Sequence, residues 1–332
     1  MAENKVSIIV PIFKVEGFIE RCARSLMEQT LREVEYIFVD DASPDRSIEI
    51  LHRTLADYPE RKEQVRILTH EQNKGLPAAR NTGINAASGD FIIHCDSDDW
   101  VEKDMYEKLY NAAIMNNSDY VACDFYMELP NLQLNYATID SKVGKVELIK
   151  SYMTYGWNVI WNVLASRELY EKYALRAYEG YTFCEDYGLS VRLLYYSQKY
   201  SRVSTPLYHY NRCNIHSIVA KANHPETLLR NTEAQIYIYK QINAFFKSHN
   251  FFEPISQELS WRMLCAKRGW LYLPNKWSEY RVTQPEINHY IWSNPLCSLK
   301  DKICQILVLS KMTAYLIYIV MLIDKIGFKL RK

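Results

Sequence analysis

The sequence predicts an α/β protein in which a mostly parallel sheet carries helices on both faces, followed by a helical C-terminal appendage. Two observations predict the sheet. Over the first 127 residues short apolar runs alternate with longer amphipathic stretches, and the apolar runs are rich in β-branched residues. A third observation predicts the appendage, because helical periodicity prevails from residue 224 onward. We therefore expect two regions, 1–223 and 224–332.

Each expected strand is a short apolar run that ends at a proline or at polar residues. The five runs are 6–10, 35–39, 65–68, 91–93 and 120–125. Between them, apolar residues recur at helical spacing in 17–31, 45–58, 76–87 and 102–116. Strands that alternate with helices in this way form parallel sheets with right-handed crossovers.

The remainder of the chain is less regular. Residues 128–223 mix short strands and helices, and 185–198 has the clearest helical pattern. Further helices are expected at 225–246, at 254–272 and from about residue 299.

The composition excludes several classes of protein but does not indicate a ligand. The chain has 40 Lys+Arg and 39 Asp+Glu, a net charge of +1, so bulk charge does not favour nucleic acid as a partner. Its eight cysteines include no pair at the spacing of a zinc knuckle or a redox motif, and we expect them to be reduced. The apolar run at residues 6–11 is too short for a secretory signal. We expect a cytoplasmic protein.

Three carboxylates, Asp96, Asp98 and Asp99, follow the fourth expected strand within four residues. Like charges packed this closely repel one another unless a cation or several N–H donors offset them. Mg²⁺ or Mn²⁺ held by one or two carboxylates and by diphosphate oxygens is a common solution. The alternative is a solvated acidic turn in which Asp99 caps the following helix.

Asp40 and Asp41 end the second expected strand, and the carboxyl ends of parallel strands meet at one rim of a sheet. A carboxylate fixed there can accept a hydrogen bond from an imide N–H such as N3 of uracil. The alternative is a turn in which Asp41 and Ser43 cap the next helix. Both interpretations remain open at this point.

A glycine-containing loop, 73–75, precedes the expected helix at 76–87, with Arg80 one turn inside it. The N-terminus of that helix would aim N–H groups at the same rim, where a phosphate could bind. Glu185 and Asp186 begin another helix, and Asp186 could act as a general base or merely cap the helix. A histidine could complete a metal site, and we favour His216 over His209.

In this order, the strings V-S-I-I-V-P-I-F, V-D-D-A-S-P-D, N-K-G-L-P-A-A-R-N-T-G, D-S-D-D and C-E-D-Y resemble family 2 of the glycosyltransferases. These are inverting enzymes with the Rossmann-like GT-A fold, and the resemblance covers about residues 5–220. It departs from the family pattern at Ala42, where glycine is frequent, and at Val163, where lysine is common after W-N.

The resemblance implies a role for each matching residue. Seven of them would form the nucleotide-sugar site. Pro11 and Phe13 would flank the base and Asp41 would contact uracil. Asn73, Gly75 and Arg80 would lie near the nucleotide, and Asp96 would contact the ribose or the sugar. Asp98 would coordinate Mn²⁺ or Mg²⁺, with His216 as the candidate second ligand. Asp186 would be the catalytic base, because it matches the Asp of the family's E-D motif.

We therefore expect an inverting hexosyl- or N-acetylhexosaminyl-transferase that uses a nucleotide-diphosphate sugar, with UDP as the expected nucleotide. The acceptor would be a glycan or lipid-linked hydroxyl in bacterial cell-surface polysaccharide synthesis. The alternative is a non-catalytic sugar-nucleotide or glycan-binding subunit on the same fold. A dinucleotide oxidoreductase fits less well, since no G-x-G-x-x-G follows the first strand.

The C-terminal end contains an apolar stretch at 303–323, interrupted by Gln305 and Lys311. The residues after it include four basic side chains and one acid, Asp324. A net positive charge of this kind favours binding to an anionic membrane leaflet. This pattern is compatible with peripheral docking on the inner face of the cell membrane, with a helix buried in the protein, or with a homodimer contact.

Overall fold

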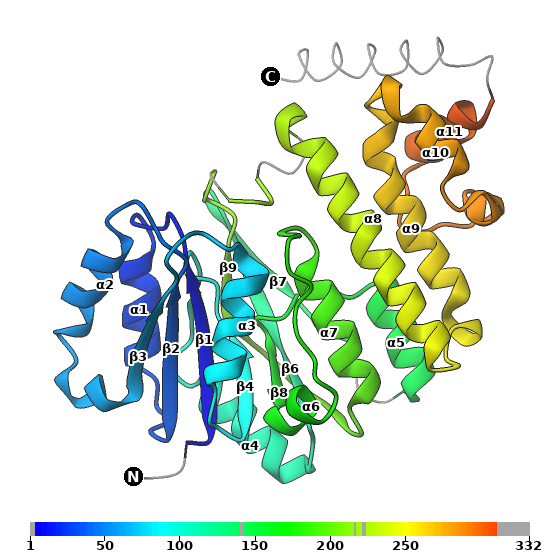
Figure 1. Ribbon diagram of the computed structural model, residues 1–332. Helices are drawn as coiled ribbons and strands as arrows, with labels where there is room; N and C mark the ends of the chain where they lie inside the picture. Colours follow the sequence, from blue (N-terminus) through cyan, green and yellow to red (C-terminus); the bar gives the residue numbers. More distant parts are fainter. Residues whose placement is uncertain (1–3, 140–142, 158, 216, 221–223, 311–332) are drawn as a thin grey trace. The chain divides into compact units, whose positions relative to one another are not determined.

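The computed structural model describes residues 4–139, 143–157, 159–215, 217–220 and 224–310 (Figure 1). The chain divides into two compact units, Met1–Lys221 and Ala222–Lys332. The sequence placed this division between residues 223 and 224.

The first unit is built on one nine-stranded sheet, in the order β3-β2-β1-β4-β8-β6-β9-β5, with β7 paired to β6. The strands are β1 (Val6–Ile12), β2 (Val34–Asp40), β3 (Val65–Thr69), β4 (Phe91–His94), β5 (Trp100–Val101), β6 (Tyr120–Leu129), β7 (Leu132–Tyr136), β8 (Val163–Ser166) and β9 (Tyr200–Asn211). All five predicted strands are present, each extended by one to four residues.

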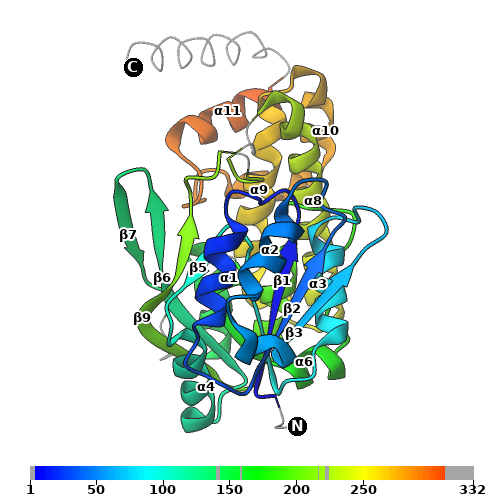
Figure 2. The same cartoon turned by 90° about the vertical axis from the view of Figure 1, so that its left-hand side faces the viewer.

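The sheet is parallel where the sequence alternates strands with helices and becomes mixed beyond that region. β1 runs parallel to β2 and β4, and β2 runs parallel to β3. β8 joins antiparallel to β4 and β6, whereas β9 runs parallel to β6 and antiparallel to the short β5. Figure 2 shows the β6–β7 hairpin projecting beside β9.

Helices cover both faces of the sheet. They are α1 (Ile19–Met27), α2 (Ser47–Leu55), α3 (Leu76–Ala86), α4 (Met105–Asn116), α5 (Lys145–Thr154), α6 (Arg167–Lys172) and α7 (Glu185–Tyr196), with a 3₁₀ helix at Pro59–Gln64. Successive side chains of β1 point to opposite faces. Ile8 and Val10 share a buried cluster with Cys22 of α1. On the other face, Gly83 of α3 lies against Ile9.

The second unit is helical, as the sequence predicts. Its helices are α8 (Pro225–Ser248), α9 (Ser256–Leu271), α10 (Trp277–Val282) and α11 (Leu299–Leu309), with 3₁₀ turns at Glu253–Ile255, Pro274–Lys276 and Pro285–Tyr290. α11 begins at a capping box of Ser298 and Asp301, and Arg268 of α9 bonds to Asp301 at 2.9 Å. Among the described residues, no helix is both long and apolar enough to cross a membrane. Most of the 303–323 stretch lies outside the described residues.

Candidate active site

The loops of the predicted site leave one rim of the sheet, where parallel strands end side by side (Figure 1). Asp40 at the end of β2 is in register with Ile12 at the end of β1, and Ile9 is in register with His94 at the end of β4. Asp41 N–H donates to Ile12 O at 3.0 Å. In open α/β sheets this rim is where ligands bind.

Asp41 holds the loop that follows β3. Its Oδ1 accepts from Lys74 N at 2.8 Å and lies 2.7 Å from Nδ1 of His70, while its Oδ2 accepts from Asn73 Nδ2 and Gly75 N, both at 2.8 Å. The residue is only 2% exposed. Asp41 therefore does not cap the next helix. Its carboxylate instead fixes the 70–75 loop, which contains the predicted site residues Asn73 and Gly75.

Pro11 and Phe13 lie at the end of β1, in the neighbouring loop. Pro11 is buried within the strand, whereas Phe13 is 39% exposed just beyond it, with the Lys14 ammonium 5.1 Å from its ring centroid. Lys14 N donates to Ser43 Oγ at 2.8 Å, which ties this loop to the one that carries Asp41. Phe13 is therefore an exposed aromatic face at the rim.

The acidic loop after β4 is secured by residues of β9 and the loop beyond it. Asp99 accepts from Tyr208 Oη at 2.6 Å and from Asn211 N at 2.7 Å, so it does not cap α4. Asp98 accepts from Asn214 Nδ2 at 2.8 Å through Oδ2. Burial and repulsion by Asp96 raise the pKa of Asp98 to about 6.

Asp96 and Asp98 have the chemistry of divalent-cation ligands. Their carboxylates repel each other, and a hard cation bound between such groups would neutralise that repulsion. Within the described ranges, however, no group of three or more His, Cys, Asp or Glu side chains forms a metal site. His216 lies outside the described residues. His209 has both ring nitrogens near carboxylates, 2.7 Å from Glu128 and 3.0 Å from Glu102, and stacks on the Trp100 ring.

Arg80 joins the acidic loop to the start of α7. Its guanidinium is buried, 1% exposed, and donates from Nη2 to Asp96 Oδ1 at 2.8 Å. Its Nε lies 3.7 Å from Oε1 of Glu185, also buried. Asp186 follows, and its Oδ1 accepts from Tyr187 N at 2.8 Å. Side chains far apart in the sequence thus meet at one charged cluster.

The cluster changes the ionisation of both α7 acids. Burial raises the pKa of Asp186 to about 6, although the positive charge of Arg80 opposes the rise. Burial and the repulsion of Asp186 raise the pKa of Glu185 to about 8. A carboxylate with a pKa near 6 is ionised at neutral pH yet basic enough to accept a proton in a transition state.

Gly75 brings the loop held by Asp41 against the approach to α7. Its φ is +88°, and a Cβ there would stand 3.2 Å from Cγ2 of Thr182. Gly75 is therefore required both for its backbone conformation and for the close approach. The 70–75 loop, Arg80, the acidic loop and Asp186 consequently line neighbouring parts of one rim.

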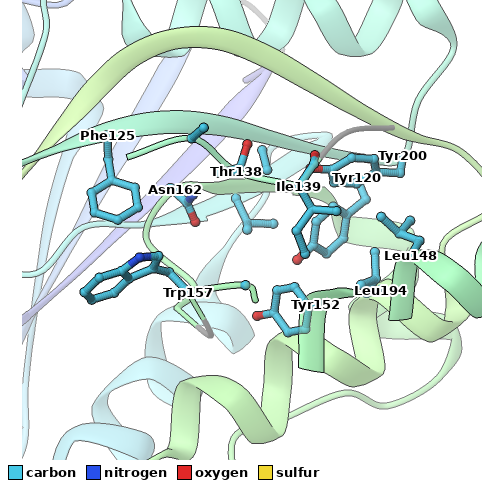
Figure 3. A pocket seen from close by; sticks show the side chains of 14 residues that line it. Tyr120, Phe125, Thr138, Ile139, Leu148, Tyr152, Trp157, Asn162, Leu194 and Tyr200 are labelled. Atoms are coloured by element: carbon cyan, nitrogen blue, oxygen red, sulfur yellow. The ribbon is translucent and has the colours of Figure 1, made fainter. Parts of the chain in front are cut away.

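Two hollows in the first unit differ in whether they lie near the acidic loop. A small cavity of ≈ 20 Å³ is lined mainly by apolar and aromatic side chains such as Phe125, Tyr152 and Trp157, and no acid is among its lining residues (Figure 3). It has room for about one water molecule, too little for a nucleotide-sugar. A wider hollow of ≈ 630 Å³ adjoins the acidic loop and is lined by Arg21 and Trp100, among others.

The sequence did not reveal several residues that complete the rim. His70 directly follows β3 and lies next to Asp41, and His94 ends β4 near Arg80; a polar residue at the end of an expected strand was the available signal. Asn211 also went unnoticed, because its bond to Asp99 joins residues 112 positions apart.

Comparisons with known proteins agree with this architecture. The model of "Glycosyl transferase family 2" matches residues 7–173. The chain is 35% identical to the uncharacterized glycosyltransferase EpsJ of Bacillus subtilis over 244 residues, covering 70% of this chain and 69% of that protein. It is 32% identical to the putative glycosyltransferase EpsH of the same organism, covering 78% and 74%.

Solved structures resemble the chain over nearly its whole length. S. aureus TarS 1-349 in complex with UDP-GlcNAc has a TM-score of 0.60 at 18% identity, covering 91% of this chain and 81% of that one. The mannosyltransferase PcManGT from Pyrobaculum calidifontis, in complex with GDP-Man and Mn²⁺, has a TM-score of 0.55 at 14% identity, covering 93% and 88%. From the family match and the fold, the chain belongs to glycosyltransferase family 2 and has a GT-A fold.

Proposed function

We propose that this glycosyltransferase moves a hexosyl or N-acetylhexosaminyl group from a UDP-sugar to a hydroxyl of a glycan or lipid-linked acceptor in cell-surface polysaccharide synthesis, with inversion at the anomeric carbon. One observation carries the proposal. Arg80 brings Asp96 of the acidic loop and the Glu185–Asp186 pair to one place on the rim where the Asp41 loop also lies.

Asp186 is the proposed base. Its carboxylate takes the proton of the acceptor hydroxyl while that oxygen attacks the anomeric carbon from the face opposite the diphosphate. The C–O bond to the leaving diphosphate breaks as the new one forms, so a single displacement inverts the centre. The raised pKa of Asp186 favours this role.

The donor nucleotide would lie along the loops that Asp41 organises. Phe13 offers an exposed ring for the base beside Pro11, and Asn73 and Gly75 belong to the loop fixed by Asp41. A contact of Asp41 with uracil stays a prediction, as does a contact of Asp96 with the ribose or sugar. UDP is proposed because the neighbour TarS was crystallised with UDP-GlcNAc.

Mn²⁺ or Mg²⁺ would be held by Asp98, with His216 as the proposed second protein ligand. When bound, the cation would offset the negative charge that develops on the leaving diphosphate. Asp98 fits because its carboxyl is repelled by Asp96 and presents one oxygen to Asn214, which leaves the other available within the described contacts.

The proposed location is cytoplasmic, with the apolar stretch 303–323 and its basic tail in peripheral contact with the inner face of the membrane. This placement would give access to a lipid-linked acceptor. A homodimer formed through the same segment is the competing use of that surface.

Turnover of a panel of UDP-, GDP- and TDP-sugars with Mn²⁺ tests the proposal, with the anomeric configuration of the product read by NMR. We expect a UDP-sugar to be used with inversion, and Asp186→Asn to lower kcat by about 10²-fold or more. Asp104→Asn, at a half-exposed acid just before α4, is the matched control and should keep wild-type activity. Retention of configuration, or full activity in Asp186→Asn, would refute the mechanism.

A further inference from the structure

Arg80 and Arg61, each 1% exposed, are the most deeply buried arginines in the described part of the chain, and the two have different partners. Arg61 donates to the backbone carbonyls of Met27, Gln29 and Leu31. Arg80 instead faces carboxylates, Asp96 at 2.8 Å and Glu185 at 3.7 Å. A guanidinium bound by backbone carbonyls serves structure, whereas one surrounded by acids also sets their charge.

Several buried polar atoms in and around Arg80 form no hydrogen bond among the described residues. Its Nε and Nη1 are buried without a hydrogen-bond partner among the described residues. The same holds for both ring nitrogens of His94, which is fully buried at the end of β4, and for the hydroxyl of Tyr170. Buried donors are costly when unpaired, so their retention beside two carboxylates calls for an electrostatic explanation.

We propose that Arg80 is a positioning residue for the catalytic base: it links the donor-binding acidic loop to the first turn of α7 and holds Asp186 in its ionised form. This inference rests on the proposed function and deepens it. Arg80 does so from α3 without contacting the reacting atoms, since its side chain is enclosed.

The charged groups around Asp186 show in which direction the loss of Arg80 would change the pKa of Asp186. Arg80 on α3 attracts its negative charge, whereas Asp96 after β4 repels it, and Glu185 is its neighbour on α7. Burial of His94 lowers the pKa of that imidazole well below its usual value, with Arg80 adding to the effect, so His94 stays neutral and supplies no second positive charge. Arg80 is thus the one cation among the groups named here.

The test compares Arg80→Gln, Arg80→Lys and Arg61→Gln in the full chain by the pH dependence of kcat for sugar transfer. The positive charge of Arg80 lowers the pKa of Asp186, and an opposite charge close to a carboxyl shifts its pKa by about one to three units. We therefore expect the acid limb of the Arg80→Gln profile to move upward by about one pH unit or more, with activity recovering toward high pH. Arg80→Lys keeps the positive charge, so its acid limb should stay close to that of the wild type.

Arg61→Gln is the matched control, because it removes an equally buried guanidinium that has no carboxylate partner among the described residues. It should lower thermal stability without moving the acid limb. If Arg80→Gln lost activity equally at every pH, or if Arg61→Gln moved the limb as far, Arg80 would be merely structural and the inference would be wrong.

A second readout needs no sugar transfer. A carboxyl whose folded pKa is raised destabilises the protein as pH rises toward that value, since the unfolded chain ionises more easily. The Tm deficit of Arg80→Gln should therefore grow between about pH 5 and pH 8, whereas that of Arg61→Gln stays constant. A constant deficit in Arg80→Gln would overturn the inference. If wild type transfers no sugar, the proposed function fails while this measurement still decides the role of Arg80.

Discussion

Replacing Asp41 by asparagine should destabilise the first unit strongly, although the side chain keeps its shape. Each carboxylate oxygen has two contacts with the 70–75 loop. Three of these four contacts are N–H bonds of 2.8 Å from Asn73, Lys74 and Gly75, and the fourth is with Nδ1 of His70 at 2.7 Å. An amide can offer only one oxygen. With its NH₂ group toward Asn73 and Gly75, two bonds are lost. With its NH₂ group toward Lys74 and His70, the Lys74 bond is lost, while Nδ1 of His70 can accept from the amide in its other tautomer.

A hydrogen bond to a charged group contributes about 1.5–3 kcal/mol, so the loss of at least one such bond should cost about 1.5 kcal/mol or more. The assay is urea unfolding of the full chain, followed by the fluorescence of the tryptophans. Asp40→Asn is the control. Asp40 is the adjacent acid and accepts a single described bond, from Ser43 N at 2.9 Å, which an amide oxygen can retain. A change below about 1 kcal/mol in Asp41→Asn, or equal changes in both variants, would show that Asp41 does not hold the loop.

Three further outcomes follow from the site. Activity should fall as pH drops through about 6, because protonation of Asp186 removes the base, and a rate independent of pH between 5 and 8 would contradict this assignment. Gly83→Ala should cost about 1–3 kcal/mol in thermal or urea unfolding, since a Cβ there would stand 2.3 Å from Cγ2 of Ile9. Chelation by EDTA should abolish transfer and Mn²⁺ should restore it, whereas full activity after exhaustive chelation would remove the metal role proposed for Asp98.

Local sequence patterns were sufficient to predict the first half of the sheet. Each of the first strands is an apolar run of β-branched residues, followed by a helix with its own periodicity, so pattern and pairing agree along the chain. The pairing of β8 and β9 depends instead on contacts between distant segments. β8 lies between β4 and β6, a position that no local signal in residues 163–166 reveals.

The same distinction holds for the candidate site. Asp41, Asp96, Asp98 and Asp186 could be singled out because acids cluster at expected strand or helix ends. The burial of Arg80 could not, because it depends on α7 packing against α3 more than 100 residues later in the chain. Likewise, the alternative that Asp99 caps a helix is wrong, because Tyr208 and Asn211 of β9 donate hydrogen bonds to it.

The late strand β9 has a consequence for any shortened form of the enzyme. A fragment that stopped at residue 173, where the family match ends, would retain the acidic loop but not Tyr208, Asn211 or Asn214. It would also lack the acids that face Arg80 from α7. Such a fragment would leave Asp99 and Arg80 as poorly compensated charges in the interior, which opposes folding. Synthesis must therefore continue well past the recognisable family segment before the catalytic centre can form.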